Sequence, residues 1–159
     1  HHGVRWINDS IATSPDRTVA ALRAFAAPAE SLVRASSNGA SRGGPLRQRI
    51  ILLAGGRDKH LPMDEMAREI MTHVKHLVLF GESAPLIQQV VESARAQANG
   101  SGREIPITLC RTLEEAVAVA EEVAQSGDIV LLSPSGTSFD VFKDFEARGQ
   151  RFKELVRAL

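Results

Sequence analysis

The sequence of 159 residues lacks several features that would place it in a specialised class of protein. It contains one cysteine, Cys110, so no disulfide can form within the chain, and this pattern indicates a reducing compartment. The formal net charge is zero, which argues against binding to nucleic acid or to a membrane surface through bulk positive charge. No apolar run approaches the length of a membrane span, and the start shows no signal-peptide pattern. The chain begins almost inside a predicted strand, which is typical of a piece of a longer protein.

The standard nucleotide-binding and metal-binding motifs are also missing. No Gly-Lys pair occurs, so the sequence has no Walker A loop. The segment 100–102 resembles part of a dinucleotide fingerprint, but it precedes a predicted strand instead of following one. His73 and His76 straddle the end of a predicted helix, so we expect a surface or packing role for them and no metal site in the chain. We expect Cys110 to be a small buried hydrophobe, because no histidine is evident beside it.

What the sequence does contain is a regular alternation of apolar strands and amphipathic helices. The composition, 43% apolar and 24% charged, is typical of one soluble globular domain spanning residues 1–159. The predicted strands are 4–7, 50–54, 76–80, 105–110 and 129–132, and the predicted helices are 14–27, 62–74, 85–98 and 112–125. This order predicts a Rossmann-like α/β fold with a mostly parallel sheet of five or six strands and helices on both faces.

One segment interrupts the alternation. Residues 31–49 contain serine, glycine and arginine but no acidic residue, and they have too little apolar content to fold alone. We expect a flexible loop within the domain, on the side away from the carboxyl ends of the strands. The alternative is a basic flap that contacts phosphate or an adjacent domain.

Ligands of parallel α/β sheets bind beyond the carboxyl ends of the strands, so the loops in those places are the candidate site. Asp9, after the first strand, could accept ribose hydroxyls, and Thr13 with nearby helix amides could bind an anion. Two glycines at 55–56 permit close backbone approach, and Lys59 adds a compact positive charge. Residues 133–138 offer hydroxyls and amides at a helix start. Together these groups suit a small ligand with a carboxylate, and a nucleoside.

A phosphoacceptor receiver domain has the same alternation but different residues at these positions. That class needs an aspartate at the end of the third strand and a lysine at the end of the fifth. The sequence has Gly81-Glu82 and Ser133-Pro134 there, so we exclude it.

Several motifs in a fixed order make the candidate loops more specific. They are GVRWINDS at 3–10, Ala12-Thr13, Gly55-Gly56, Asp58-Lys59, LSP at 132–134, SFD at 138–140, and FKDFE with Arg148-Gly149 and Phe152. In this combination the chain resembles the C-terminal domain of the Mur ligases over essentially its whole length. Within that family it is most similar to the members that add D-glutamate.

The resemblance implies a three-domain cytoplasmic enzyme of peptidoglycan synthesis. Its N-terminal domain would bind the UDP-sugar, and its central domain would bind ATP and Mg²⁺ and contain the catalytic histidine. The C-terminal domain would bring D-glutamate, whose amine attacks the acyl phosphate formed from UDP-N-acetylmuramoyl-L-alanine and ATP; the products are the amide, ADP and phosphate. The partners implied are these substrates and the other two domains. The family pattern places no catalytic residue in this domain, so the chain alone should be inactive.

The motifs also imply a role for individual residues of this chain. Asp9 and Asn8 would contact the nucleotide, Asp9 through its ribose. The residues implied for the carboxylates of D-glutamate are Thr13, Lys59 and Ser138, with backbone amides near Phe139 and Phe145. The chemistry agrees, because a ligand with two carboxylates needs a positive charge and several oriented donors when it is partly desolvated. We expect Phe142 and Phe152 to lie in the core and residues 133–139 to form a donor-rich rim.

Two departures from the family pattern stand out. Ile11 occupies the place of a lysine, so one cationic contact is missing, and Arg57 or the 31–49 loop are the candidates to replace it. A strand with a nucleotide-binding arginine is also expected upstream of Gly3. Two alternatives stay open at this point: a stand-alone module that binds a nucleotide or amino acid, and a related amide ligase such as a folylpolyglutamate synthetase. The SFD motif at 138–140, followed by Phe145-Glu146 and Arg148-Gly149, argues against a folylpolyglutamate synthetase.

Overall fold

The structure is a computed structural model that describes residues 1–26, 49–98 and 104–159. Residues 31–48 of the predicted loop lie outside these ranges, as does the glycine-containing segment at 99–102. The helices are α1 (Pro15–Ala26), α2 (Asp64–His73), α3 (Ala84–Gln97), α4 (Leu113–Val123) and α5 (Phe145–Ala158). The strands are β1 (Arg5–Asn8), β2 (Ile50–Gly55), β3 (Val74–Phe80), β4 (Ile107–Leu109) and β5 (Ile129–Ser135).

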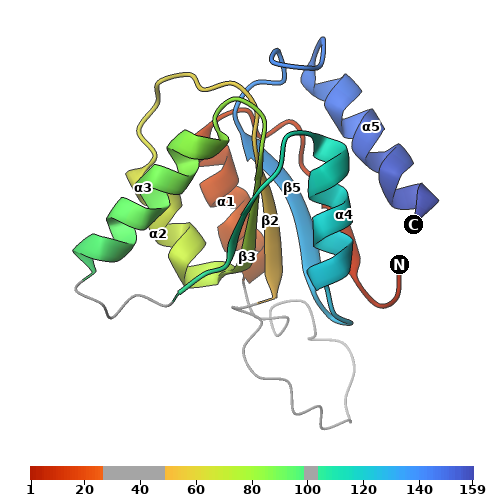
Figure 1. The fold of residues 1–159 in the computed structure, drawn as a ribbon, viewed down its shortest axis with the longest axis horizontal. Coiled ribbons are helices and arrows are strands. Elements are labelled where there is room, and N and C mark those ends of the chain that lie inside the picture. The colour runs from red at the N-terminus through yellow and green to blue at the C-terminus, as the bar shows by residue number, and fades with distance from the viewer. Residues whose placement is uncertain (27–48, 99–103) are drawn as a thin grey trace, which may run out of the picture.

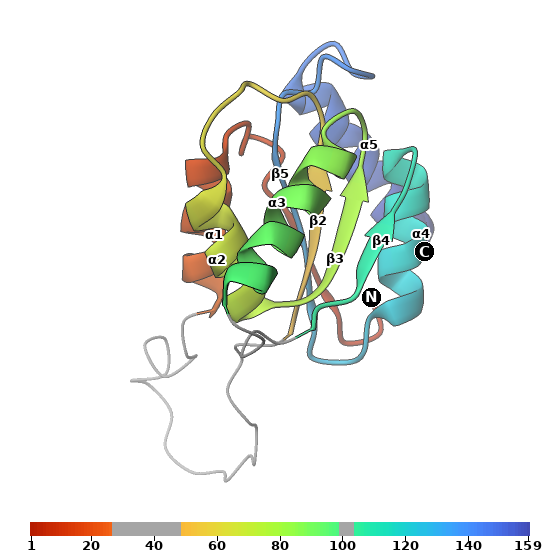
Figure 2. The same cartoon turned by 60° about the vertical axis from the view of Figure 1, so that its left-hand side comes forward.

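Within the described residues the strands form one parallel sheet in the order β1-β5-β2-β3-β4. Helices α1, α2 and α3 cover one face of it, and α4 and α5 cover the other (Figures 1 and 2). The predicted α/β fold with helices on both faces is therefore confirmed.

The alternation of side chains along the buried strands divides the core into two layers. In β2, Ile50, Leu52 and Ala54 pack under α1–α3, whereas Ile51 and Leu53 pack under α4 and α5. Successive side chains of a strand point to opposite faces, so a continuous aliphatic run is what a sheet covered on both faces requires. All five of these side chains are fully buried.

The direction of the crossovers explains which helices share a face. The chain passes from β1 through α1 to β2, leaving a gap that β5 fills later, and continues outward to β4. It then reverses through α4 to reach β5 between β1 and β2. Because crossovers between parallel strands are right-handed, reversing the direction moves α4 to the opposite face. The carboxyl end of β5 is therefore the switch point of the fold.

The predicted helix 62–74 is wrong at its C-terminal end. Val74 has extended backbone angles (φ −89°, ψ 130°) and already pairs with Ile50, so β3 follows α2 with no loop between them. A buried β-branched side chain fits this strand start better than a last helical turn. The predicted start of α4 is confirmed, because Thr112 Oγ1 accepts a hydrogen bond from the N–H of Glu115 (3.2 Å).

Strand β5 is longer than predicted because it contains a bulge. Leu53 pairs with Leu132 and Gly55 pairs with Ser135, so Ser133 and Pro134 together lie opposite Ala54. Proline is disfavoured inside a central strand, which is why the sequence predicted an end at Leu132. The bulge accommodates the proline and lets the strand continue to Ser135.

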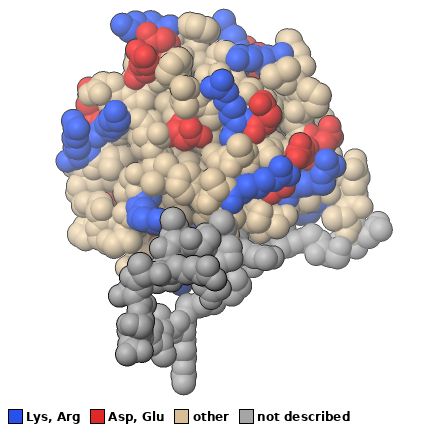
Figure 3. Space-filling view, turned by 180° about the vertical axis from the view of Figure 1, so that it is seen from behind, with Lys and Arg blue, Asp and Glu red and all other residues tan. Residues whose placement is uncertain are grey.

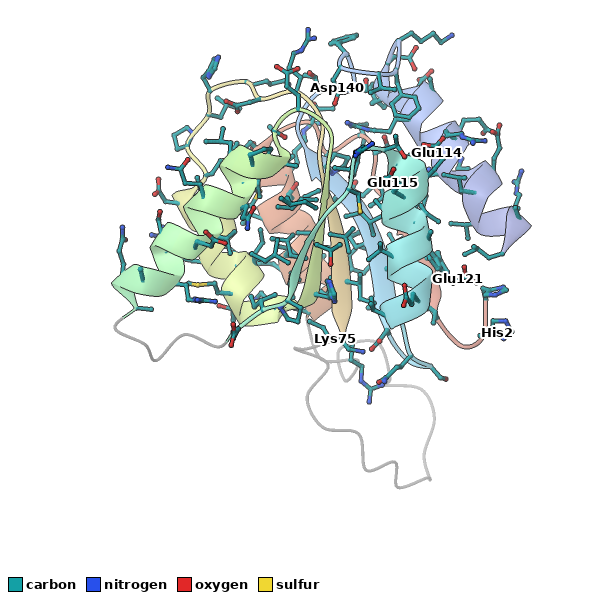
Figure 4. All side chains as sticks on the ribbon, viewed as in Figure 1. His2, Lys75, Glu114, Glu115, Glu121 and Asp140 are labelled. Atoms are coloured by element: carbon teal, nitrogen blue, oxygen red, sulfur yellow. The ribbon has the colours of Figure 1, made fainter. Side chains whose placement is uncertain are left out.

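Charged side chains are mixed in sign over the described surface. Figure 3 shows Lys and Arg interspersed with Asp and Glu on the face seen from behind. In Figure 4, Asp140 lies at the end of the sheet where the strands finish, and Lys75 lies at the opposite end. No helix in the described ranges is long and apolar enough to cross a membrane.

Candidate functional site

The loops that follow β1, β5 and β2 meet at the carboxyl edge of the sheet. The backbones of the second and third are in direct contact, because Arg57 and Thr137 exchange two hydrogen bonds (2.8 and 3.0 Å). The first is joined to β5 by the bond from the N–H of Ser135 to the carbonyl of Ala12 (2.9 Å). The three loops that the sequence singled out are therefore parts of one surface.

Glycine makes this close crossing of loops possible. A Cβ on Gly136 would lie 2.8 Å from the carbonyl oxygens of both Gly55 and Arg57, and a Cβ on Gly56 would lie 2.3 Å from the carbonyl oxygen of Thr137. Real Cβ atoms do not approach carbonyl oxygens this closely. Gly56 also has a φ of +98°, which side chains rarely adopt. The close backbone approach that Gly55 and Gly56 permit is thus seen between loops of the protein, and an approach to a ligand stays a prediction.

Asp9 lies directly after β1 with its carboxylate half-buried against β5. The hydroxyl of Ser133 donates to its Oδ2 (2.9 Å), and its own N–H donates to the carbonyl of Leu132 (2.8 Å). Burial raises the pKa of Asp9, while the Ser133 hydrogen bond and the positive charge of Arg17 act in the opposite direction. The carboxylate is thus held in one orientation and keeps lone pairs for further donors.

Lys59 and Thr13 come together from different loops. The Nζ of Lys59 lies 3.4 Å from the Oγ1 of Thr13, although the residues are 46 positions apart. Lys59 is exposed and Thr13 is half-buried. An ammonium beside a hydroxyl at the start of α1 forms a pair of donors for an anion.

Ser138 is buried (2% exposed) in the loop between β5 and α5. Its carbonyl accepts hydrogen bonds from the N–H groups of Val141 (3.2 Å) and Phe142 (2.8 Å). The loop therefore makes a tight turn directly after Ser138, and the adjacent Thr137 is fixed by its pairing with Arg57. The predicted donor-rich rim is a structured loop.

The phenylalanines of this segment divide between the rim and the core. Phe152 is 2% exposed, which confirms its predicted core position. Phe142 is half-buried: it packs against the core layer under α4 and α5 and also lines a surface cleft. Phe139 is 61% exposed and Phe145 is 36% exposed. Phe145 is the first residue of α5, so its N–H has no carbonyl partner within the helix. The proposed amide contact is thus geometrically available at Phe145.

Both polar atoms of the Asn8 side chain form hydrogen bonds within the protein. Its Nδ2 donates to the carbonyl of Gly149 in α5 (3.1 Å), and its Oδ1 accepts from the N–H of Ser10 (3.2 Å). The close approach leaves little room at Gly149, where a Cβ would lie 3.1 Å from Asn8 Nδ2. Asn8 therefore joins the loop after β1 to α5, and its contact with a nucleotide stays a prediction.

A cation lies close to the expected lysine position, and the sequence assigned no role to it. Ile11 is 52% exposed, and its carbonyl accepts a hydrogen bond from the Nη1 of Arg17 (3.1 Å). Arg57, one of the two candidates to replace the lysine, forms an exposed ion pair with Glu82 (3.1 Å). Arg17 stands instead beside Ile11 and acts electrostatically on Asp9. Arg17 is the third residue of α1, and no sequence motif marked it as a site residue.

Arg148, which the sequence placed in a family motif without a role of its own, is fully buried (0% exposed). Its Nε donates to the hydroxyl of Ser10 (3.0 Å), its Nη2 to the carbonyl of Ser10 (2.9 Å) and its Nη1 to the carbonyl of Gly136 (3.2 Å). Burial lowers its pKa to about 10, with the charge of Asp140 acting in the opposite direction. The sequence did contain one indication that Arg148 is buried. It lies four residues before Phe152, and this spacing places both side chains on one face of a helix.

Ser135 combines backbone strain with an unpaired polar group. It has a φ of +66°, although it is not glycine, and its buried hydroxyl has no hydrogen-bond partner in the described part of the chain. Such a conformation persists only where the surroundings impose it. Here the bulge of β5 and the crossing loops on either side of Ser135 impose it.

A cleft of about 800 Å³ lies beside α5, near these loops. Its walls include Asn8, Ser10, Ile11 and Phe145, whereas Thr13, Lys59 and Ser138 do not line it. The cleft thus adjoins the candidate site on the side of β1 and α5.

The histidines and the cysteine that the sequence raised have other surroundings. His73 Nε2 contacts Glu69 (3.0 Å), and His76 Nε2 contacts Thr108 Oγ1 (2.9 Å). Their ring nitrogens therefore face different partners. Cys110 is half-buried against the core layer under α4, and burial raises the pKa of its thiol, which keeps it protonated.

The sequence is similar to a known protein family and to several known enzymes. The family described as "Mur ligase, glutamate ligase domain" matches residues 1–136. The chain is 43% identical over 158 residues to the UDP-N-acetylmuramoylalanine–D-glutamate ligase of Acetivibrio thermocellus, covering 99% of this chain and 29% of that protein. The enzyme of the same name from Symbiobacterium thermophilum is 41% identical over 157 residues, covering 99% of this chain and 28% of that protein. The chain thus spans less than a third of the length of these curated relatives.

A solved structure resembles the fold. The crystal structure of a murein peptide ligase, Mpl, from Psychrobacter arcticus 273-4 superposes with a TM-score of 0.59 at 13% sequence identity. The match covers 99% of this chain and 28% of that one. At this identity the likeness supports the arrangement of strands and helices alone.

Proposed function

Because the chain belongs to the Mur ligase family through its glutamate ligase domain, we propose that residues 1–159 form the C-terminal domain of a three-domain ligase. That enzyme adds D-glutamate to UDP-N-acetylmuramoyl-L-alanine in peptidoglycan synthesis, in the cytoplasm. The carboxylate of the UDP-linked substrate takes the γ-phosphoryl group of ATP, and the amine of D-glutamate displaces phosphate to form the amide. The N-terminal and central domains hold the UDP-sugar, most of ATP and the Mg²⁺.

The observation that supports this proposal most is the meeting of Lys59 and Thr13 at the carboxyl edge of the sheet. D-Glutamate has two carboxylates, so its site needs a positive charge and several donors. Lys59 provides the charge, and Thr13 and Ser138 provide hydroxyls. The N–H groups near Phe139 and Phe145 complete the set. The chain's residues thus bind and orient the incoming amino acid, and the reacting phosphoryl group is held by other domains.

Asp9 is the residue of this chain suited to the nucleotide. Its carboxylate is fixed by Ser133 and retains free acceptor positions, which fits the paired hydroxyls of a ribose. Asn8 adjoins it and is the second proposed nucleotide contact. Holding the nucleotide and D-glutamate on neighbouring loops of one domain lets that domain bring both to the other substrate.

The test is a specificity assay on the complete ligase that contains this chain. Purified enzyme is given ATP, Mg²⁺ and UDP-N-acetylmuramoyl-L-alanine, with D-glutamate, L-lysine or diaminopimelate as the amine, and phosphate release is measured. We expect release that saturates with D-glutamate and stays at background with the other two. Release with L-lysine or diaminopimelate but not with D-glutamate would show that the substrate assignment is wrong.

A further inference from the structure

The side chain of Arg148 is buried without an ion-pair partner. It is 0% exposed, and its three hydrogen bonds go to neutral oxygens: the hydroxyl and carbonyl of Ser10 and the carbonyl of Gly136. In the described ranges no carboxylate lies within ion-pair distance of it. Asp140, in the loop before α5, acts on it electrostatically.

Such an arrangement costs stability. An ion transferred from water to a protein interior loses its hydration, and neutral acceptors replace only part of it. An apolar side chain of similar length would fill the same space without that cost. The charge and the forked shape of the guanidinium therefore have a use that packing alone does not explain.

The contacts of Arg148 reach all three loops of the candidate site. Ser10 lies between Asp9 and Thr13 in the loop after β1. Gly136 lies two residues before Ser138 in the loop after β5. The guanidinium also adjoins the loop that leads to Lys59, because a Cβ on Gly56 would lie 3.0 Å from Arg148 Nη1. The planar guanidinium presents donors in several directions at once, which suits contacts to more than one loop.

The hydroxyl of Ser10 extends this connection to α5. It accepts from Arg148 Nε (3.0 Å) and donates to the carbonyl of Phe145 (2.8 Å). The first turn of α5, which presents the Phe145 N–H, is therefore tied to the same residue that flanks Asp9. Movement of any one loop would break bonds in the others.

We propose that Arg148 is a positioning residue of the D-glutamate site, which fixes the three loops relative to one another and gives the site positive potential from inside the protein. It does not touch the ligand. The inference rests on the proposed function, since it concerns the amino-acid site of that reaction. A buried charge attracts an anion more strongly than an exposed one, because little water lies between them.

The experiment compares Arg148→Lys and Arg148→Gln with the unmodified complete ligase. The readouts are KM for D-glutamate, KM for ATP and kcat. We expect KM for D-glutamate to rise by about tenfold or more in Arg148→Gln, as for the loss of a hydrogen bond to a charged group. Arg157→Gln is the matched control, because Arg157 is an exposed arginine at the far end of the same helix. We expect its KM to equal that of the unmodified enzyme.

A pH series separates the charge from the packing. Burial lowers the pKa of a lysine more readily than the pKa of an arginine. The ammonium of Arg148→Lys should therefore lose its proton as the pH rises, whereas the guanidinium of the unmodified enzyme keeps its charge. We compare KM for D-glutamate in Arg148→Lys with KM in the unmodified enzyme. We expect KM of the variant, divided by KM of the unmodified enzyme, to increase from slightly acidic to slightly alkaline pH. Asp140 is the charged group facing this position from the loop before α5, and Ser10 and Gly56 present only neutral atoms, so Asp140→Asn is run in parallel.

The outcomes distinguish this inference from the proposed function. If the unmodified enzyme does not use D-glutamate, the proposed function fails. If it does, but folded Arg148→Gln binds D-glutamate with unchanged KM, the inference about Arg148 is wrong by itself. Should Arg148→Gln fail to fold, Ser10→Ala takes its place, since it removes one acceptor of Arg148 and one bond to α5 without removing a charge. An unchanged KM in Ser10→Ala would likewise overturn the inference.

Discussion

The hydroxyl of Ser133 donates a hydrogen bond to the carboxylate of Asp9 over 2.9 Å, across 124 positions of the chain. Ser133 lies in the bulge of β5, and its hydroxyl oxygen also lies 3.3 Å from Thr18 Oγ1 in α1. The bulge thus aims a donor at the acidic residue of the neighbouring strand. The candidate nucleotide contact depends on a strand irregularity that regular pairing would not produce.

Replacing Asp9 by asparagine should stabilise the protein at neutral pH. Burial raises the pKa of Asp9 in the folded state, so its ionisation opposes folding once the pH exceeds the unfolded pKa of about 3.9. The cost is fully present above the folded pKa and disappears below the unfolded value. We expect Asp9→Asn to raise Tm at neutral pH, with the difference vanishing in acid, and to raise KM for ATP in the complete ligase.

Asp16 provides a control of opposite sign. Hydrogen bonding from Ser14 lowers its pKa in the folded state, so its ionised form contributes stability above the unfolded pKa and loses it as the pH falls. Asp16→Asn should therefore lower Tm slightly at neutral pH. Equal effects of the two substitutions on Tm would contradict the assignment of Asp9 as a desolvated carboxylate.

Lys59→Ala should raise KM for D-glutamate roughly ten- to hundredfold in the complete ligase, because it removes the positive charge closest to Thr13. KM for ATP should change little. Arg57→Ala is the matched control, since Arg57 lies in the same loop with its guanidinium paired to Glu82. Steady-state kinetics of the two variants distinguish the residues. A larger effect from Arg57→Ala would transfer the carboxylate contact to Arg57.

Ser135→Gly should stabilise the protein by about 1 kcal/mol. Glycine relieves the left-handed conformation, worth about 1–2 kcal/mol, and removes a buried hydroxyl without a partner. The greater freedom of glycine in the unfolded chain offsets about 0.5–1 kcal/mol of this gain. Ser135→Ala removes the hydroxyl but keeps the strain, so urea denaturation should rank the glycine variant above the alanine variant. The reverse order would show that the backbone at this position is not strained.

Phe152→Ala should destabilise the protein by about 3–5 kcal/mol, as for other buried phenylalanines. Phe152 is a buried residue of α5, and its ring centroid lies 6.1 Å from that of Trp6. Phe139→Ala is the control of equal chemistry, because the Phe139 side chain is 61% exposed. Its unfolding free energy should match the unmodified protein within about 0.5 kcal/mol. Comparable losses in both variants would mean that Phe139 packs in the folded state.

The fold could be predicted from sequence because its signals are local. The aliphatic run at 50–54, the capping residues at 112–115 and the apolar spacing of the helices each define an element without reference to the rest of the chain. Two of the differences in element bounds have a common cause. Val74 and Ser135 belong to strands because of pairing with β2, which outweighs a continuing helical pattern in one case and a proline in the other.

The sequence predicted the loop residues of the candidate site but not the residues that support those loops. Lys59, Thr13 and Asp9 follow strands, and the rule for parallel sheets places such residues together. Arg148 was missed because arginine is rarely buried, and its three acceptors include two backbone carbonyls that no sequence pattern encodes. Arg17 was missed because its contact is with the carbonyl of Ile11, a bond that depends on the path of the loop.

The place of β5 in the sheet has a consequence for biosynthesis. Among the described strands β5 comes last along the chain, yet it fills the gap between β1 and β2. Until it arrives, the nascent chain presents two unpaired strand edges and the apolar side chains on both sides of them. A chain interrupted after α4 would lack the strand that joins the sheet, and it would lack two partners of the Asp9 loop, Ser133 and Arg148. Nonsense and frameshift lesions that remove β5 should therefore yield aggregation, and not a shortened protein with weaker binding.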